Sequence, residues 1–212
     1  MSTAMLLNQY RQLVSGNGER PLNQPVTTDE VLADVWAQLV RAKHDRKSEL
    51  RWLNVATLAS DGAPQLRTVV LRDVQCDKRV ITFHTDRRSG KFAQLSADSR
   101  TALHFHDRRR CLQIRMSGRA ELIVMPSSQL IWSQLPDAAR KTYLQAMMPG
   151  AEIDAPEESR LGSLAQDLGA ENFAVIDVEV DDIDWLELKS SSHRRASFKW
   201  SGMNWVGQWV AP

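Results

Sequence analysis

The sequence has few of the residues and patterns that mark metal, redox or membrane proteins. Its 212 residues include only two cysteines, Cys76 and Cys111, and they form neither a Cys-x-x-Cys redox motif nor a metal-ligand spacing. The N-terminus lacks the basic and apolar segments of a signal peptide, and no apolar run is long enough to span a bilayer. We therefore expect a soluble, cytoplasmic protein with no metal site and no membrane partner.

An excess of charge of either sign is also absent. Lys and Arg total 27, Asp and Glu total 26, and the formal net charge is +1. No long-range field favours a nucleic-acid partner, so any anion site must be local. The chain also lacks a G-x-G-x-x-G turn and a Walker loop, which argues against Rossmann and P-loop nucleotide sites.

What the sequence does contain is a long series of strand patterns within the length of one domain. We expect a single domain over residues 1–212, with residues 1–27 as an N-terminal extension. Apolar residues at helical spacing predict a helix over residues 28–47 that covers one opening of a barrel. Apolar alternation predicts strands over residues 51–57, 66–74, 79–85, 100–106, 111–124, 173–188, 194–200 and 204–210.

Helices are predicted between these strands, over residues 88–97, 126–148 and 159–168, with an acidic loop within residues 149–160. The strand over residues 111–124 is long enough to bend at Gly118. Antiparallel strands with inserted helices favour a mainly β (α+β) fold, a closed or nearly closed barrel with peripheral helices.

Cations gather in the segment 67–91. Ser89 is a good N-cap for the helix that follows, and the N–H groups of a helix N-terminus attract anions. Lys91, together with Arg87 or Arg88, adds positive charge there, and Arg67 on the neighbouring strand can close the same site. Each of these cations taken singly is equally typical of a solvated surface. Together they predict a phosphate site.

The same segment resembles a known family. The chain reads Arg-x-Val-x-x-Arg at 67–72, Phe-His-Thr at 83–85 and Ser-Gly-Lys at 89–91. Gln113 precedes Gly118 by five residues, Trp185 is followed by His193 and Arg195, and the chain ends in Ala-Pro. This ordered set, which covers residues 51–121 and 173–212, is similar to pyridoxamine 5'-phosphate oxidase. That family has Arg-x-Val-x-x-Lys, Phe-Tyr-Thr and Ser-Arg-Lys at the three motifs.

The resemblance implies an FMN-binding split β-barrel that forms a homodimer, with the cofactor across the dimer interface. The resemblance also implies which residues contact each part of FMN. The phosphate is surrounded by Arg67, Ser89 and Lys91. Along the isoalloxazine ring lie Val69, Val70 and Arg72, flanked by His84 and Thr85, with Gln113 hydrogen-bonded to the flavin and with Trp185 and Arg195 contributed by the partner subunit.

The chain departs from the family on the substrate side. Trp132 stands near the position of a substrate-binding tyrosine, and Pro136 stands where an arginine should fall. Near the C-terminus the family's Arg-x-His becomes Ser191-Ser192-His193. Losing both arginines removes charged contacts, each contributing about 1.5 to 3 kcal/mol, that a substrate phosphate would need. Pyridoxamine phosphate is therefore not the expected substrate.

These patterns predict an FMN-dependent oxidoreductase with an unidentified small-molecule substrate, which Arg72 and His193 contact near the flavin. Two alternatives remain open. One is a non-catalytic flavin-binding or storage protein. The other is a haem-binding split barrel that uses His104, His106 or His193, although ordinary strand histidines are favoured over ligands.

Overall fold

The structure is a computed structural model that describes residues 27–155, 157, 166–189 and 192–212 of the chain. The predicted N-terminal extension lies almost entirely outside the described residues, as does most of the helix predicted over residues 159–168.

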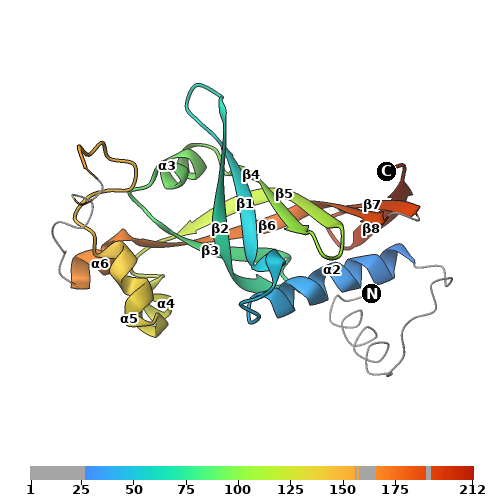
Figure 1. Ribbon diagram of the computed structural model, residues 1–212, viewed down its shortest axis with the longest axis horizontal. Coiled ribbons are helices and arrows are strands. Elements are labelled where there is room, and N and C mark those ends of the chain that lie inside the picture. Colours follow the sequence, from blue (N-terminus) through green and yellow to red (C-terminus); the bar gives the residue numbers. More distant parts are fainter. Residues whose placement is uncertain (1–26, 156, 158–165, 190–191) are drawn as a thin grey trace.

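Within the described residues, eight antiparallel strands form one sheet that closes on itself (Figure 1). Their order is β3-β2-β1-β4-β5-β6-β7-β8, and an additional pairing of β3 with β6 joins the first six into a barrel. This confirms the mainly β fold expected from the alternating apolar pattern. The strands are β1 Trp52–Leu58, β2 Pro64–Gln75, β3 Val80–Asp86, β4 Arg100–Asp107, β5 Leu112–Ile123, β6 Phe173–Lys189, β7 Ser192–Trp200 and β8 Trp205–Val210.

Strand β6, 17 residues long, belongs both to the barrel and to an extension of it. Its residues 173–179 pair with β3, whereas its residues 182–189 pair with β7. Strands β7 and β8 therefore continue the sheet beyond the barrel, toward the right-hand end in Figure 1.

Alternate side chains of the strands fill the barrel. Leu53 and Val55 on β1, Leu71 on β2, and Ile81 and Phe83 on β3 have no exposed surface. Fully burying each such side chain contributes roughly 1.5 to 3 kcal/mol. Because a slip of one residue would turn these side chains outward, their burial fixes the register and assigns the residues between them to the other face of the sheet.

Helix α2 (Thr28–Ala42) starts at a capping box and packs against β2, β7 and β8. Thr27 Oγ1 accepts a hydrogen bond from the Glu30 N–H at 3.2 Å, and a Glu30 carboxylate oxygen accepts from the Thr27 N–H at 2.9 Å. The predicted end at residue 47 is wrong, because residues 43–47 offer no apolar side chain to bury. Asp45 instead accepts from the Lys47 N–H at 2.8 Å in a turn, followed by the 3-10 helix η1 (Glu49–Arg51).

Strand β5 bends where the sequence predicts it. The register with β6 shifts between Ser117 and Gly118. A Cβ atom at residue 118 would meet the carbonyl oxygen of Glu179 on β6. Only glycine permits this close approach of the two backbones, so the bulge and the bend depend on Gly118.

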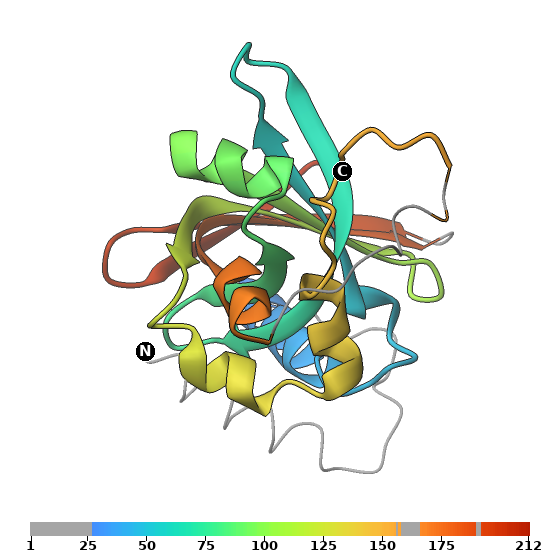
Figure 2. The ribbon, with the colours of Figure 1, turned by 90° about the vertical axis from the view of Figure 1, so that its left-hand side faces the viewer.

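Short helices pack against the start of β6 at one end of the barrel. The predicted continuous helix over residues 126–148 is wrong: the chain forms α4 (Gln129–Gln134), α5 (Asp137–Arg140) and the 3-10 helix η2 (Lys141–Tyr143). Pro136 explains the break, because it disfavours helical backbone at Leu135, whose ψ is 137°. Figure 2 shows α4 and α5 grouped with α6 (Gln166–Asn172) at this end, below α3 (Gly90–Ala97). No helix in the described residues is long and apolar enough to cross a membrane.

Candidate functional site

Arg67 on β2 is held against α3 by neutral acceptors. Its guanidinium donates to Thr57 Oγ1 at 2.5 Å and to the Val55 carbonyl oxygen at 3.2 Å. Its other terminal nitrogen donates to Gln94 Oε1 on α3 at 3.0 Å, and Gln94 also accepts from Thr57 at 2.6 Å. These contacts fix the position of the guanidinium without neutralising its charge.

Lys91 reaches the same region from the first turn of α3. Its Nζ donates to Thr85 Oγ1 at 3.1 Å, and Thr85 Oγ1 lies 3.1 Å from Ser89 Oγ. Ser89 is the N-cap residue of α3, as predicted, but its hydroxyl meets Thr85 and makes no capping hydrogen bond. An ammonium, two hydroxyls and an uncapped helix N-terminus therefore meet at one place. We call Arg67, Thr85, Ser89 and Lys91 the cradle.

The two cations of the cradle repel each other. Burial lowers the pKa of Lys91, and the positive charge of Arg67 lowers it further, while Asp86 acts in the opposite sense. Burial also lowers the pKa of Arg67. Among the described residues neither cation forms an ion pair. An anion bound here would relieve this repulsion.

The neighbouring arginines contribute less than the sequence suggests. Arg88 pairs with Asp86, with Nη2 2.7 Å from Oδ2, and this hydrogen bond raises the pKa of Arg88. Arg87 is exposed and donates to the Glu171 carbonyl oxygen at 3.4 Å. The free charge of the cradle therefore comes from Arg67 and Lys91.

His84, Arg72 and Tyr143 form a second group, on the outer side of β3. The His84 ring meets Phe173 edge-to-face, with centroids 4.9 Å apart, and its buried Nδ1 has no partner among the described residues. Burial lowers the pKa of His84 to about 4, with a further contribution from Arg72. Burial raises the pKa of Tyr143 to about 12, against the effect of Arg72. The exposed Arg72 is thus a cation beside two neutral groups, an arrangement that suits an anionic or carbonyl group of a ligand.

Val69 and Val70 face opposite sides of β2. Val69 is buried in the barrel core, whereas the half-buried Val70 pairs with Trp52 on the outer face. A ligand on the outer face can therefore contact the Val70 side chain but not that of Val69.

Gln113 and Arg195 share one row of the outer face. Gln113 pairs with Leu186 on β6, and Leu186 pairs with Arg195 on β7. Arg195 Nη2 lies 2.7 Å from Asp184 Oδ2, and this hydrogen bond raises the pKa of Arg195. Trp185 faces the opposite side of the sheet, where it is only 5% exposed and packs edge-to-face with Trp209.

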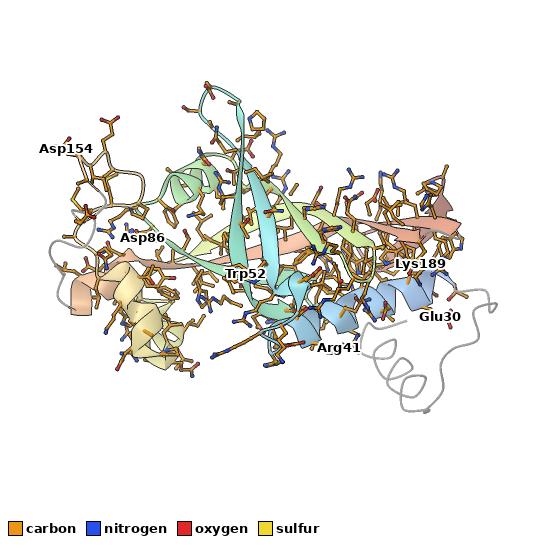
Figure 3. All side chains as sticks on the ribbon, viewed as in Figure 1. Glu30, Arg41, Trp52, Asp86, Asp154 and Lys189 are labelled. Carbon is orange, nitrogen blue, oxygen red and sulfur yellow. The ribbon has the colours of Figure 1, made fainter. Side chains whose placement is uncertain are left out.

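The structure separates the expected FMN residues into two groups within one chain. Asp86, next to Thr85 of the cradle, and Lys189, at the end of β6, lie toward opposite ends of the long axis (Figure 3). His193 is exposed and pairs with Leu188, one residue before Lys189. Arg72 and His193, predicted to contact one substrate, are therefore not brought together by a single chain.

Three residues of the site are absent from the sequence-based prediction: Thr57, Gln94 and Tyr143. Gln94 had a usable signal, because it lies one helical turn after Lys91 and so shares its helix face. Thr57 and Tyr143 had none, since their contacts depend on strand register and on the packing of η2.

The described residues contain no group of three or more His, Cys, Asp or Glu side chains that could hold a metal ion. The rings of His104 and His106 stack with centroids 6.4 Å apart. Both nitrogens of His104 lie near amide groups, those of Asn54 at 3.5 Å and Gln113 at 3.2 Å.

A known protein family matches the segment of the chain that contains the cradle. Residues 33–124 match the family described as pyridoxamine 5'-phosphate oxidase, FMN-binding domain. Over this segment the chain resembles the pyridoxamine 5'-phosphate oxidase-like FMN-binding family. The matched segment contains every expected cofactor position from Arg67 to Gln113, and it ends before Trp185 and Arg195.

Individual relatives of this family match over part of their length. The pyridoxine/pyridoxamine 5'-phosphate oxidase of Hyphomonas neptunium is 33% identical over 104 residues, 49% of this chain and 46% of that protein. The enzyme of the same name from Cupriavidus pinatubonensis is 32% identical over 111 residues, 50% of this chain and 51% of that protein. The chain thus spans about half the length of the curated relatives it matches.

Solved structures share the fold more completely. A pyridoxamine 5'-phosphate oxidase-related, FMN-binding protein from Nostoc punctiforme superposes with a TM-score of 0.71 at 24% identity, covering 84% of this chain and 96% of that one. PhzG from Burkholderia lata, in complex with tetrahydrophenazine-1-carboxylic acid, gives a TM-score of 0.68 at 20% identity, covering 93% and 100%. At these identities the likeness supports the split-barrel fold.

FMN is the cofactor of the family's domain, and the cradle offers the groups that its phosphate requires. Arg67 and Lys91 supply two positive charges without a carboxylate partner among the described residues. Thr85 and Ser89 supply hydroxyls, and the start of α3 supplies backbone N–H groups. The residues present therefore fit the group.

Proposed function

We propose that the chain is a cytoplasmic FMN-dependent oxidoreductase that holds the FMN phosphate in the cradle. The observation that carries this proposal is the pair of neighbouring cations, Arg67 and Lys91, neither of which forms an ion pair with a described carboxylate. A dianionic phosphate matches such a pair in charge, and the adjoining helix N-terminus adds hydrogen-bond donors.

Bound FMN supplies a ring that accepts a hydride or an electron pair from the substrate and passes it to a second acceptor. The chain's own residues bind and orient. Val70, Arg72, His84 and Thr85 are assigned to the ring side of the site. Because burial keeps the imidazole of His84 neutral at pH 7, His84 adds no second charge beside Arg72.

We further propose that the functional unit is a homodimer in which Gln113 and Arg195 of one chain complete the FMN site of the other, while Trp185 packs on the opposite face of the same sheet. The wide separation of the two groups within one chain supports this arrangement (Figure 3). The outer face also exposes Trp52 by 56% and Leu66 by 68%, side chains that a second copy would cover.

A phosphorylated pyridoxamine substrate fits this chain poorly. Trp132 is only 5% exposed and packs against Tyr143 and Phe173, so it cannot take the place of a hydrogen-bonding tyrosine. Pro136 has no donor to offer in place of an arginine. We therefore propose a small substrate without a phosphate group. Arg72 of one chain and His193 of the partner subunit would contact it.

Turnover assays distinguish an enzyme from a flavin store. Purified protein loaded with FMN is mixed anaerobically with NADH, NADPH or a panel of amines, and bleaching of the flavin absorption is followed. We expect at least one reductant to bleach the flavin absorption. Air should then restore the absorption, and the cycle should be repeatable. Tight FMN binding without any turnover would favour the storage function.

Mixed dimers test whether the site is shared. Lys91→Met and Arg195→Ala are each expected to weaken FMN binding alone. If each site takes Lys91 from one chain and Arg195 from the other, a dimer of one Lys91→Met and one Arg195→Ala chain contains one intact site. Coexpressed variants should therefore regain tight FMN binding, and failure to regain it in purified mixed dimers would contradict a shared site.

A further inference from the structure

A line of hydrogen-bonded side chains crosses four strands on the outer face of the barrel. Thr68 on β2 donates from Oγ1 to Asn54 Oδ1 on β1 at 2.8 Å. Asn54 Nδ2 lies 3.5 Å from Nδ1 of His104 on β4, and His104 Nε2 lies 3.2 Å from Oε1 of Gln113 on β5. The line therefore ends at the residue expected to meet the flavin.

The order of donors and acceptors along this line is determined from its first member. Because the Thr68 hydroxyl donates to the Asn54 oxygen, the Asn54 amide nitrogen faces His104, and His104 Nδ1 must accept. A neutral imidazole that accepts at Nδ1 carries its proton at Nε2, so His104 donates to Gln113 Oε1. The NH₂ group of Gln113 then remains available to a ligand.

Neighbouring residues hold His104 in this arrangement. Its direct partner across the strands is Arg115, whose Nη2 lies 2.9 Å from Asp184 Oδ2 on β6. Arg115 is thereby drawn toward β6, and His104 reaches diagonally to Gln113. On the same face, the His106 ring stacks on His104 with an angle of 12° between the planes.

We propose that His104 is a positioning residue that makes Gln113 a hydrogen-bond donor to the cofactor. This inference rests on the proposed function, because it assigns the Gln113 NH₂ group to an acceptor of the isoalloxazine ring, a carbonyl oxygen or a ring nitrogen. The opposite arrangement, with every hydrogen bond of the line reversed, would present Gln113 Oε1 and favour a donor on the ligand.

The apoprotein tests the line without any cofactor. Nitrogen-15 NMR of the neutral form of His104, assigned with a His104→Gln variant, should give a pyridine-like shift at Nδ1 and a pyrrole-like shift at Nε2. The converse pattern would mean that His104 donates to Asn54, and it would overturn the proposal.

Two variants of matched size test the consequence for FMN. His104→Gln can still accept from Asn54 and donate to Gln113, so its Kd for FMN should stay within about twofold of wild type. His104→Glu can only accept, so Gln113 must turn its NH₂ group toward residue 104 and present an oxygen to the ring. We expect FMN to bind about tenfold or more weakly.

His106→Glu is the control for added negative charge on the same face. It should change the Kd much less than His104→Glu, and an equal loss in both variants would show that charge alone is responsible. Equal affinity of His104→Gln and His104→Glu would also overturn the proposal. If the NMR shows the expected tautomer but wild-type protein does not bind FMN, the hydrogen-bonded line stands and the proposed function fails. If FMN binds but the tautomer is reversed, the proposed function stands and the role of His104 fails.

Discussion

Replacing Lys91 with methionine should weaken FMN binding without weakening the apoprotein. The variant keeps the length of the side chain and removes the charge that the phosphate contacts. A hydrogen bond to a charged group contributes about 1.5 to 3 kcal/mol, so the Kd for FMN should rise roughly 10- to 150-fold. Fluorescence titration of the apoprotein with FMN measures this change.

The effect on the apoprotein should have the opposite sign or be near zero. The pKa of Lys91 is lowered from 10.5, chiefly by burial and then by Arg67, so the charged form costs stability in the absence of an anion. Removing the charge relieves that cost, while losing the hydrogen bond to Thr85 costs about 1 kcal/mol. Between the lowered folded pKa and 10.5, the unfolded state binds more protons, so wild-type stability should rise with pH relative to Lys91→Met.

Lys78→Met is the matched control, since it removes the same charge from an exposed turn between β2 and β3. It should leave the Kd for FMN unchanged. Unchanged affinity in Lys91→Met would refute the placement of the phosphate, and a loss of apoprotein stability as large as the loss of binding would assign Lys91 a structural role.

Two further predictions concern stability. The pKa of His84 is about 4 in the folded protein, against an ordinary value of 6.5. The apoprotein should therefore lose roughly 3 kcal/mol of unfolding free energy as the pH falls from above 6.5 to below 4. Urea unfolding of His84→Gln should lack this part of the pH dependence, whereas the control His106→Gln should retain it. Gly118→Ala places a Cβ against the Glu179 carbonyl oxygen and should cost on the order of 3 kcal/mol in thermal unfolding; Gly90→Ala, whose Cβ would come no closer than 3.9 Å to Gln94, is the control, and equal stability of the two variants would contradict the role of Gly118.

Local patterns accounted for much of the fold. Apolar alternation located the strands because one face of each strand fills the barrel, and apolar residues at helical spacing located the start of α2. Helix ends were less predictable. The polar residues 43–47 continue a helical composition but have no core to face, and Pro136 divides a segment whose apolar residues otherwise suggest one helix.

The candidate site was predictable only where sequence motifs mark its residues. The cradle follows from the motifs around Arg67 and Lys91. The contact of His104 with Gln113 required the register and a diagonal reach between neighbouring strands. Tyr143 shares the Phe173 ring with His84 only because η2 packs against the start of β6. The pairing of Arg88 with Asp86 is local and could have been anticipated from their spacing.

We propose that this chain binds FMN through Arg67 and Lys91. Titration of the purified apoprotein with FMN, followed by flavin fluorescence and visible absorption, measures this binding. We expect saturable quenching with one FMN per chain, and an affinity about tenfold or more weaker in Arg67→Ala. Fluorescence equal to that of free FMN throughout the wild-type titration would contradict the claim.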